Sequence, residues 1–347
     1  MNPLEQMVIP LLDWYRENAR DLPWRRTEDP YQILLSEVML QQTRVAAVIG
    51  YYHRFLETAP TVETLAGLEE DVLLKLWQGL GYYNRARNLQ KMAKTVMAEH
   101  GGRFPDTYEG LLGLPGVGEY TAGAVSSIAF GRCEAAVDGN VLRVVTRLTA
   151  DPSDITKTET KRRIAADLKN VMPVEFPGRF NQALMELGAT LCGPNRAPQC
   201  LACPCAHFCK AHTAGTAAQL PVKSPKKVKT EENRTVFILS CDGSYALQKR
   251  PDSGLLAGLW EFPNIPGSLD MAQGLESIKN WGLQPRQPLR EIKRQHIFTH
   301  IKWHMQGLYI EVSEKHGAFT WFTAREIRNH AALPTAFRQF WEEIDHV

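Results

Sequence analysis

The spacing of apolar residues changes once along this 347-residue chain, and that change limits the folds it can adopt. Up to about residue 220, apolar residues recur at helical spacing, without the alternation of a strand. The run Pro221-Val222-Lys223-Ser224-Pro225-Lys226-Lys227-Val228-Lys229 is then typical of an exposed linker. Strand-like patterns follow it. The sequence therefore predicts an all-α region over residues 1–220, a linker over 221–233 and an α+β domain over 234–347.

Individual elements follow from the same periodicity. In the first region we expect helices over residues 4–20, 31–53 and 179–191, and a helix that begins at 61 and is broken at 79. Further helices are expected after this break as far as about residue 100, from residue 108 onward, and from residue 158 onward. In the second region we expect strands over residues 235–239, 245–249, 295–303 and 305–312. Short helices are expected near residues 271–281 and 334–344.

A glycine-containing stretch in the helical region has the chemistry of an anion site. Leu114-Pro115-Gly116-Val117-Gly118 lies between two apolar helical patterns, and its glycines allow a tight turn that exposes backbone N–H groups. A helix that starts behind such a turn suits a phosphate. Asp138 follows twenty residues after Gly118, in Val137-Asp138-Gly139-Asn140-Val141, where a helix should start. The alternative is a packing corner between helices, with Asp138 as a simple N-cap.

Two further segments contain residues that a purely structural helix avoids. Glu37 lies between Leu35 and Val38, so it either faces solvent or occupies a pocket that raises its pKa. The segment Gly79-Leu80-Gly81-Tyr82-Tyr83-Asn84-Arg85-Ala86-Arg87 combines glycines, tyrosines and arginines, a composition that suits unstacked bases. The alternative for this segment is a helix junction with buried tyrosines.

The cysteines predict a metal centre. Cys192, Cys200, Cys203 and Cys209 have the form C-x7-C-x2-C-x5-C, with Cys205 inside the last gap. Structural zinc usually uses two close cysteine pairs, and only one is present. Unequal gaps that fold around one centre favour a cubane iron–sulfur cluster over zinc. Such a centre has a structural or electron-transfer role, because nothing in the pattern indicates an open coordination position.

Composition limits the remaining possibilities. The formal net charge is only +2, so any binding to nucleic acid must come from local basic patches. The sequence has no run of eighteen apolar residues, and its first residues lack the features of a signal peptide. We therefore expect a cytoplasmic protein that neither spans a membrane nor is secreted.

Taken together, these motifs resemble the helix-hairpin-helix DNA glycosylase superfamily, and within its iron–sulfur branch the adenine glycosylases of the MutY family. The resemblance rests on the hairpin, on Asp138, and on three segments: Leu22-Pro23-Trp24-Arg25, Ser36-Glu37-Val38-Met39-Leu40-Gln41-Gln42-Thr43 and Gly79-Leu80-Gly81-Tyr82-Tyr83. It covers nearly the whole chain. It implies a six-helix barrel module over roughly residues 24–133, an iron–sulfur module from 1–23 and 134–220, and a C-terminal Nudix-like domain that recognises lesions.

The resemblance also implies a reaction, the removal of adenine mispaired with 8-oxoguanine or G in duplex DNA. Glu37 would protonate the flipped adenine and Asp138 would stabilise the oxocarbenium ion, with Tyr120 and Asn140 in support. The relatives that also cleave the DNA strand carry a lysine as Schiff-base nucleophile where this chain has Tyr120, so the resemblance implies a monofunctional enzyme. The alternatives are a glycosylase/lyase for oxidised pyrimidines and a non-catalytic iron–sulfur DNA-binding protein.

Binding residues follow from the resemblance by position. The adenine pocket would be lined by Trp24, Arg25, Leu40, Val45 and Gln182. Residues beside the opposing 8-oxoguanine would be Gln42, Leu80 and Tyr82, and a backbone phosphate would lie on Gly116 and Gly118. One 4Fe-4S cluster would be held by Cys192, Cys200, Cys203 and Cys209, although the family usually has six residues between the first two cysteines and this chain has seven. The partner would be double-stranded DNA, bound by a monomer in the bacterial nucleoid.

The C-terminal domain lacks the glutamate-rich segment that a Nudix hydrolase needs for its metals, so the resemblance implies lesion recognition without hydrolysis. Phe298-Thr299-His300 matches the family's Phe-Ser-His lesion-reading loop. Thr299 replaces the serine and also carries a hydroxyl group. His296, His300 and His304 raise the alternative of a metal site. Residues four apart on one strand are about 13 Å apart, too far to share an ion, so we expect none there.

Overall fold

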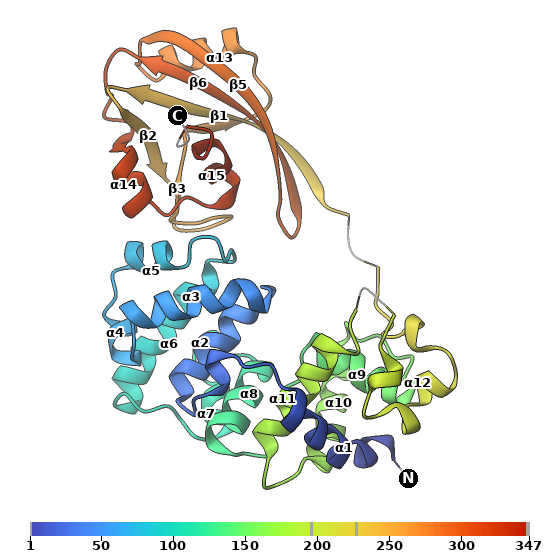
Figure 1. The fold of residues 1–347 in the computed structure, drawn as a ribbon. Helices are drawn as coiled ribbons and strands as arrows, with labels where there is room; N and C mark the ends of the chain where they lie inside the picture. The colour runs from blue at the N-terminus through green and yellow to red at the C-terminus, as the bar shows by residue number, and fades with distance from the viewer. Residues whose placement is uncertain (1, 195–196, 226–227, 345–347) are drawn as a thin grey trace. The chain divides into compact units, whose positions relative to one another are not determined.

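The computed structural model describes residues 2–194, 197–225 and 228–344 (Figure 1). The chain divides into two compact units, one of Met1–Gly67 and Asn88–Pro225 and the other of Leu68–Arg87 and Lys226–Val347. Residues 226 and 227 of the predicted linker lie outside the described residues. The division of residues 1–220 into a barrel module and an iron–sulfur module stays a prediction.

The first unit is helical, and the structure places no strand among the described residues before Thr230. The predicted all-α class of this region is therefore confirmed. Its elements are α1 (Pro3–Asn18), η1 (Pro23–Arg25), α2 (Pro30–Leu40), α3 (Val45–Thr58), α4 (Val62–Ala66), most of α6 (Asn84–His100), α7 (Tyr108–Leu112), α8 (Glu119–Phe130), α9 (Gly139–Thr149), α10 (Thr158–Val171), α11 (Pro177–Thr190), η2 (Cys200–Ala202), η3 (Ala206–Phe208), α12 (Lys210–Thr213) and η4 (Ala217–Gln219).

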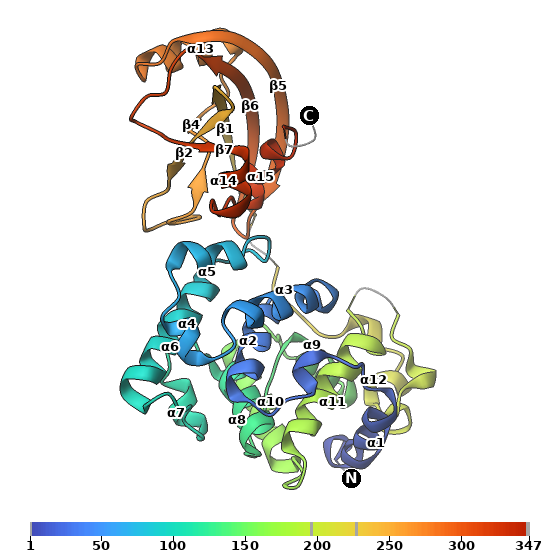
Figure 2. The same cartoon turned by 60° about the vertical axis from the view of Figure 1, so that its left-hand side comes forward.

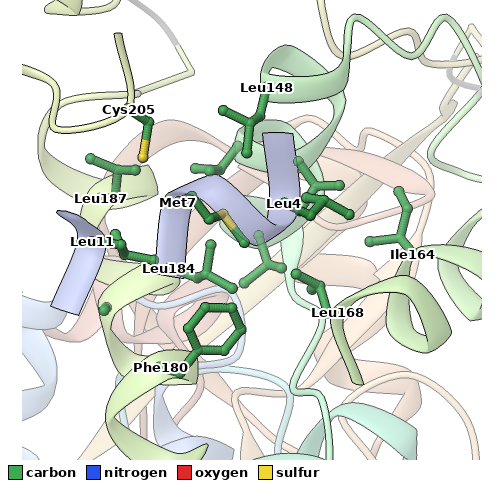
Figure 3. Packing of buried hydrophobic residues seen from close by; sticks show 14 of the residues in the cluster. Leu4, Met7, Leu11, Leu148, Ile164, Leu168, Phe180, Leu184, Leu187 and Cys205 are labelled. Carbon is green, nitrogen blue, oxygen red and sulfur yellow. The ribbon is translucent and has the colours of Figure 1, made fainter. Parts of the chain in front are cut away.

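The N-terminal helix packs against helices from the far end of this unit. Leu4, Met7 and Leu11 recur at three- or four-residue spacing, which places them on one face of α1. Figure 3 shows this face buried against residues of later helices, including Leu148 of α9 and Phe180 of α11. The burial of this stripe holds the start of the chain against α9, α10 and α11.

Two predicted helices of this region are wrong in extent. The helix expected over residues 31–53 is two helices, because α2 ends at Leu40 and α3 begins at Val45. Gln42 has a φ of 60°, a left-handed conformation that a continuous right-handed helix cannot contain. The helix expected from Thr61 is also divided, because α4 ends at Ala66 and α5 begins at Glu70. Apolar spacing is helical on both sides of each break, so periodicity could not reveal them.

The second unit contains a mixed sheet and its flanking helices. Its elements are α5 (Glu70–Leu76), β1 (Thr230–Cys241), β2 (Ser244–Lys249), β3 (Trp260–Glu261), β4 (Asn264–Pro266), α13 (Met271–Asn280), β5 (Pro285–Ile297), β6 (Ile301–Val312), β7 (Thr320–Thr323), α14 (Ala324–Asn329) and α15 (Thr335–Trp341). The strand order is β3-β2-β1-β6-β5, with β4 paired to β1 and β7 paired to β2. Strand β1 runs parallel to β6, and β5 runs antiparallel to β6.

Helices cover both faces of this sheet. Val236 and Ile238 of β1 lie in one apolar cluster with Phe337 of α15, whereas Phe237 and Leu239 lie in another with residues of α13. Successive residues of a strand point to opposite faces, so the continuous apolar run of β1 is buried on both sides. Figure 2 shows α13 set apart from the pair α14 and α15. This arrangement confirms the predicted α+β class.

The strands predicted over residues 295–303 and 305–312 are wrong in extent. Residues 298–300 form a turn between β5 and β6, and the Phe298 N–H donates to the Ile301 carbonyl across it. Phe298-Thr299-His300 contains neither glycine nor proline, so the sequence carries no turn signal there. The predicted strands over 235–239 and 245–249 fall inside β1 and β2. Among the described residues, no helix is both long and apolar enough to cross a membrane.

Candidate active site

Glu37 is a buried acid in an apolar helix. Asp29 caps α2 by accepting a hydrogen bond from the Tyr31 N–H, and Pro30 occupies the first turn, where its missing N–H has no cost. The helix is apolar around most of its circumference, and Glu37 is only 6% exposed. Of the two sequence interpretations, the solvent-facing one is wrong. A carboxyl group in this position needs a partner inside the protein.

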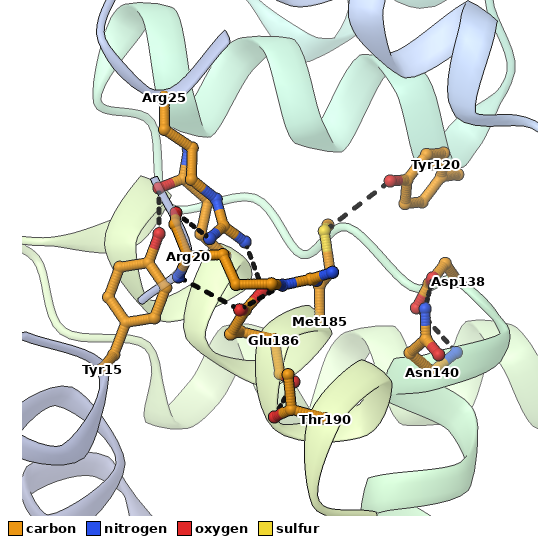
Figure 4. Close-up of polar contacts among 10 residues, drawn as sticks. Tyr15, Arg20, Arg25, Tyr120, Asp138, Asn140, Met185, Glu186 and Thr190 are labelled. Carbon is orange, nitrogen blue, oxygen red and sulfur yellow. Dashed lines mark hydrogen bonds and ion pairs between the residues drawn. The ribbon is translucent and has the colours of Figure 1, made fainter. Parts of the chain in front are cut away.

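Tyr120 is that partner. It lies in the first turn of α8, which begins directly after Gly118, and its hydroxyl donates to Glu37 Oε2 at 2.5 Å. The same hydroxyl lies 3.7 Å from the Met185 sulfur (Figure 4). Burial raises the pKa of Tyr120 well above its usual value, and the nearby Glu37 carboxyl adds to this rise. Tyr120 therefore stays protonated and acts as a donor.

The environment of Glu37 keeps a proton on it near neutral pH. Burial raises the pKa of Glu37 from 4.5 to about 7. The hydrogen bond from Tyr120 and the charge of Arg25 act to lower this pKa, and the charge of Asp138 acts to raise it. A large fraction of Glu37 is therefore protonated at pH 7, as a general acid requires.

Asp138 is held as an ion by the helix that it caps. Its Oδ1 accepts the backbone N–H groups of Asn140 and Val141 at 2.9 and 2.8 Å, at the start of α9. Its Oδ2 accepts the Asn140 side-chain amide at 2.7 Å (Figure 4). Burial raises the pKa of Asp138, while these three donors oppose the rise. Since every one of these partners donates, the arrangement favours the carboxylate.

The Asn140 side chain is held in place by Arg143 and by the close approach of α11. Its Oδ1 accepts from Arg143 at 2.8 Å, and α11 approaches it so closely that a Cβ on Gly188 would lie 2.6 Å from the Asn140 Cβ. Arg143 also donates to the carbonyl of Cys192 at 2.7 Å. A chain of hydrogen bonds thus runs from Asp138 through two side chains of α9 to the first cysteine of the cysteine loop.

Glu37 and Asp138 line the same cavity, which has a volume of about 720 Å³. The loop between α2 and α3 forms part of its wall, so the unpredicted break at Gln42 contributes to the site. The predicted residues that line the cavity are Trp24, Arg25, Glu37, Leu40, Gln42, Val45, Gly116, Gly118, Tyr120, Asp138, Asn140 and Gln182. The predicted residues therefore bring two acids, a phenol, three amides and an arginine to one space large enough for a nucleoside.

Other residues in the lining were not predicted from the sequence, among them Arg20, Gln41, Thr43, Glu119, Met185 and Glu186. Glu186 is fully buried and pairs with Arg20 and Arg25. In the segment Leu184-Met185-Glu186-Leu187, as at Glu37, an acid lies between apolar residues of a helix. This pattern could have identified Glu186 from the sequence.

The chain is similar in sequence to known DNA repair proteins. Residues 35–170 match the family model of the HhH-GPD superfamily base excision DNA repair proteins, and residues 234–343 match that of the NUDIX domain. Adenine DNA glycosylase of Homo sapiens is 37% identical over 95% of this chain and 72% of its own length. The chain belongs to the adenine DNA glycosylase family. Adenine DNA glycosylase of Rattus norvegicus is 36% identical over 95% of this chain and 76% of its own length. That of Buchnera aphidicola (subspecies Baizongia pistaciae) is 32% identical over 88% of this chain and 86% of its own length.

Solved structures of related glycosylases share the helical region. A thermostable thymine-DNA glycosylase is 29% identical, with a TM-score of 0.56, over 61% of this chain and 97% of its own. A non-covalent endonuclease III–DNA complex is 26% identical, with a TM-score of 0.52, over the same shares of the two chains. Together with the family model over residues 35–170, these likenesses identify a helical glycosylase core of the base excision repair type.

In this adenine glycosylase family member, the four predicted cysteine ligands surround a small cavity of about 30 Å³. Arg147 lies in the same lining and donates to the Cys192 sulfur at 3.2 Å. Cys205 does not line this cavity: it is 2% exposed and lies in the apolar core with Met7 and Leu187 (Figure 3). No group of three or more His, Cys, Asp or Glu residues in the described part of the chain is arranged to hold a metal ion.

The loop with the additional residue spans residues 193–199, of which 195 and 196 lie outside the described residues. Next to this gap, the Gln199 N–H donates to the Leu191 carbonyl at 2.9 Å, and the Cys192 N–H donates to that of Leu187 at 2.8 Å. Both ends of the loop are therefore tied to the end of α11.

Two segments predicted to contact the lesion meet within the second unit. The Tyr82 hydroxyl lies 3.0 Å from Thr299 Oγ1, at the turn between β5 and β6. Tyr82 is half-exposed, whereas Leu80 is only 6% exposed. Phe298 packs edge-on against His296 and Trp303. These predicted contacts lie outside the lining of the cavity that holds Glu37.

The histidines of this region have other partners. His304 Nε2 lies 2.6 Å from the Glu231 carboxylate, and its Nδ1 lies 3.2 Å from Gln295. The expected placement of these histidines on one strand was wrong, because His296 lies on β5 and His304 lies on β6.

Proposed function

We propose that this protein removes adenine mispaired with 8-oxoguanine or guanine in duplex DNA. The observation that carries the proposal is the pair of carboxyl groups in one cavity: burial raises the pKa of Glu37 to about 7, and the Asp138 carboxyl accepts three hydrogen bonds that favour its ionised form. The names of the curated relatives point to the same base. Solved DNA complexes of endonuclease III, which share the helical fold, support DNA as the partner.

The two acids have complementary roles. Adenine leaves deoxyribose readily only after its ring gains a proton, and Glu37 supplies that proton once the base has been flipped into the cavity. Tyr120 orients the Glu37 carboxyl through the hydrogen bond to Oε2. Bond cleavage leaves a cationic sugar, which the Asp138 carboxylate stabilises. Asn140 holds Asp138 in place through Oδ2.

The cavity lining supports a monofunctional enzyme. A strand-cleaving lyase needs an amine that forms an imine with the sugar, and no lysine is among the described residues that line the cavity. The cationic side chains among the described lining residues are those of Arg20 and Arg25, and neither is an amine. The hairpin glycines Gly116 and Gly118 precede α8, and the N–H groups at the start of that helix suit a DNA phosphate.

The proposal includes one 4Fe-4S cluster at the cysteine loop. Four thiols surround one cavity, and Arg147 supplies an N–H···S hydrogen bond of the kind that stabilises cluster thiolates. Cys192, Cys200, Cys203 and Cys209 would be its ligands. A bound cluster would link these four cysteines through one centre.

The second unit supplies lesion recognition in this proposal. The hydroxyls of Tyr82 and Thr299 form a polar pair at an exposed turn, where they suit the hydrogen-bonding edge of an oxidised guanine. Helix α13 contains Glu276 as its single acid, so it lacks the acidic set that nucleotide hydrolysis requires.

A strand-nicking assay tests the function. Duplexes with adenine opposite 8-oxoguanine should give a nicked product only after alkali, because excision leaves an intact abasic strand. The E37Q variant should bind the same duplex and excise at least a hundredfold more slowly, since it keeps the shape of the side chain and loses the proton. Nicking without alkali would support the glycosylase/lyase alternative, and an E37Q variant with the wild-type rate would exclude Glu37 as the acid.

A further inference from the structure

Besides Glu37 and Asp138, the cavity lining contains a buried acid that this mechanism does not use. Glu186 lies on α11, and its side chain is fully buried. Its Oε1 accepts the Arg20 Nε at 2.6 Å and the Arg20 backbone N–H at 3.2 Å. Its Oε2 accepts the Arg20 Nη2 at 2.8 Å and the Arg25 Nη2 at 2.6 Å (Figure 4). Each oxygen of the carboxylate thus receives two donors.

These contacts define what Glu186 can do. Burial acts to raise the pKa of Glu186, but the hydrogen bonds from Arg20 and Arg25 outweigh it and lower that pKa. Glu37, in the same cavity, has a phenol as its hydrogen-bond partner, and its pKa is raised. The Glu186 carboxyl group is therefore ionised near neutral pH and cannot serve as a proton donor. Its chemistry is that of a fixed counter-ion.

Glu186 is one of several groups that hold the segment between α1 and η1, in which Asp21 also pairs with Arg26 and the Arg25 guanidinium lies 5.4 Å from the centre of the Tyr15 ring. Arg20 and Arg25 lie between α1 and the end of η1, a stretch in which neither the C-cap of α1 nor the N-cap of η1 has a side-chain hydrogen bond. Arg25 also donates from Nη1 to the Arg20 carbonyl at 3.0 Å, so both of its outer nitrogens are held. Its side chain is 13% exposed and lines the cavity.

The position of Arg25 matters for the chemistry. The charge of the Arg25 guanidinium acts to lower the pKa of Glu37, so this guanidinium lies within electrostatic range of the general acid. Without Glu186, two guanidinium groups would face each other with no anion between them, and their repulsion would displace the more weakly held one. A displacement of about 1 Å at a reacting site is enough to slow a reaction by two orders of magnitude.

We propose that Glu186 is a positioning residue for adenine excision, which holds the Arg25 guanidinium at the cavity wall in the place where the flipped base is bound. The inference rests on the proposed function and adds a residue to it. Glu186 acts on the reaction through Arg25, and Arg20 serves as the second support of the same carboxylate.

The first test is the E186Q variant, which keeps the side-chain shape and loses the charge. We expect its single-turnover excision rate on adenine opposite 8-oxoguanine to fall by about 10- to 100-fold. Its affinity for a duplex with an uncleavable 2′-fluoro adenosine should stay within about threefold of the wild type, since phosphate contacts dominate that affinity. The matched control is E134Q, which removes a carboxylate from the Glu134–Lys169 ion pair outside the cavity and should keep the wild-type rate.

A double-mutant cycle separates positioning from a general structural role. If Glu186 acts through Arg25, then R25M alone and R25M with E186Q should have the same rate within about threefold. The E186D variant keeps the charge on a shorter side chain and should recover part of the rate, which also provides a measurement if E186Q does not fold.

Three results would overturn the inference: an E186Q rate equal to that of the wild type, multiplicative effects of E186Q and R25M, or a loss of thermal stability in E186Q with an unchanged rate per folded molecule. Failure of the proposed function is distinguishable from these, because the wild-type protein would then excise no adenine.

Discussion

The pKa values of Glu37 and Glu186, which line the same cavity, are shifted in opposite directions because their neighbours differ. Glu186 receives hydrogen bonds from two arginines and stays ionised. Glu37 receives one from a neutral phenol, so burial dominates and raises its pKa to about 7. The same side chain thus serves as a counter-ion in one place and as an acid in the other.

The raised pKa of Glu37 predicts how stability depends on pH. Between pH 4.5 and about 7 the folded protein binds a proton that the unfolded chain has released, so the free energy of unfolding falls as pH rises through this interval. The shift corresponds to about 3 kcal/mol. The E37Q variant cannot titrate there, so it should be more stable than the wild type at pH 8 and lose this advantage at pH 4. Urea denaturation at both pH values measures the difference, and equal pH dependence of the two proteins would contradict the prediction.

At the scale of elements, the breaks between helices place residues of the candidate active site, as the helices themselves do. The interruption at Gln42 separates α2 from α3 and places three consecutive residues of the loop, Gln41 to Thr43, in the cavity wall. The start of α9 orients Asp138 through its own N–H groups. Catalytic groups are therefore placed by helix ends and junctions, where backbone donors are not used by the helix itself.

The cysteine loop allows a prediction with a built-in control. The C203A variant removes a thiol that lines the loop cavity, so it should lose bound iron and visible absorption and unfold at lower temperature. The C205A variant removes a thiol from the apolar core instead, so it should keep its iron and lose only about 1 kcal/mol of stability. Iron and sulfide analysis with thermal unfolding measures both variants. Equal loss of iron in the two would refute the assignment of ligands.

For the whole molecule, excision and lesion reading are predicted to lie in different units, which makes them separable. The T299V variant removes the hydroxyl that contacts Tyr82 and keeps the side-chain shape. We expect its preference for adenine opposite 8-oxoguanine over adenine opposite guanine to fall by about fivefold, the value of one hydrogen bond, with excision opposite guanine unchanged. The control is T320V, at an exposed position that begins β7. An equal loss of excision on both substrates would contradict the prediction.

The amino-acid sequence by itself determined the fold classes, the hairpin, the N-cap at Asp138 and the four-cysteine pattern, because each of these depends on local spacing or on residue types close together in the chain. The tertiary structure alone decided that Glu37 is buried, that Cys205 belongs to the core, and that Gln42 and the turn at Thr299 interrupt their elements. It also decided that Glu186 meets Arg20 and Arg25, more than 160 residues away in the chain. Burial and charge pairing depend on residues far apart in sequence, and the pKa of Glu37 depends on both.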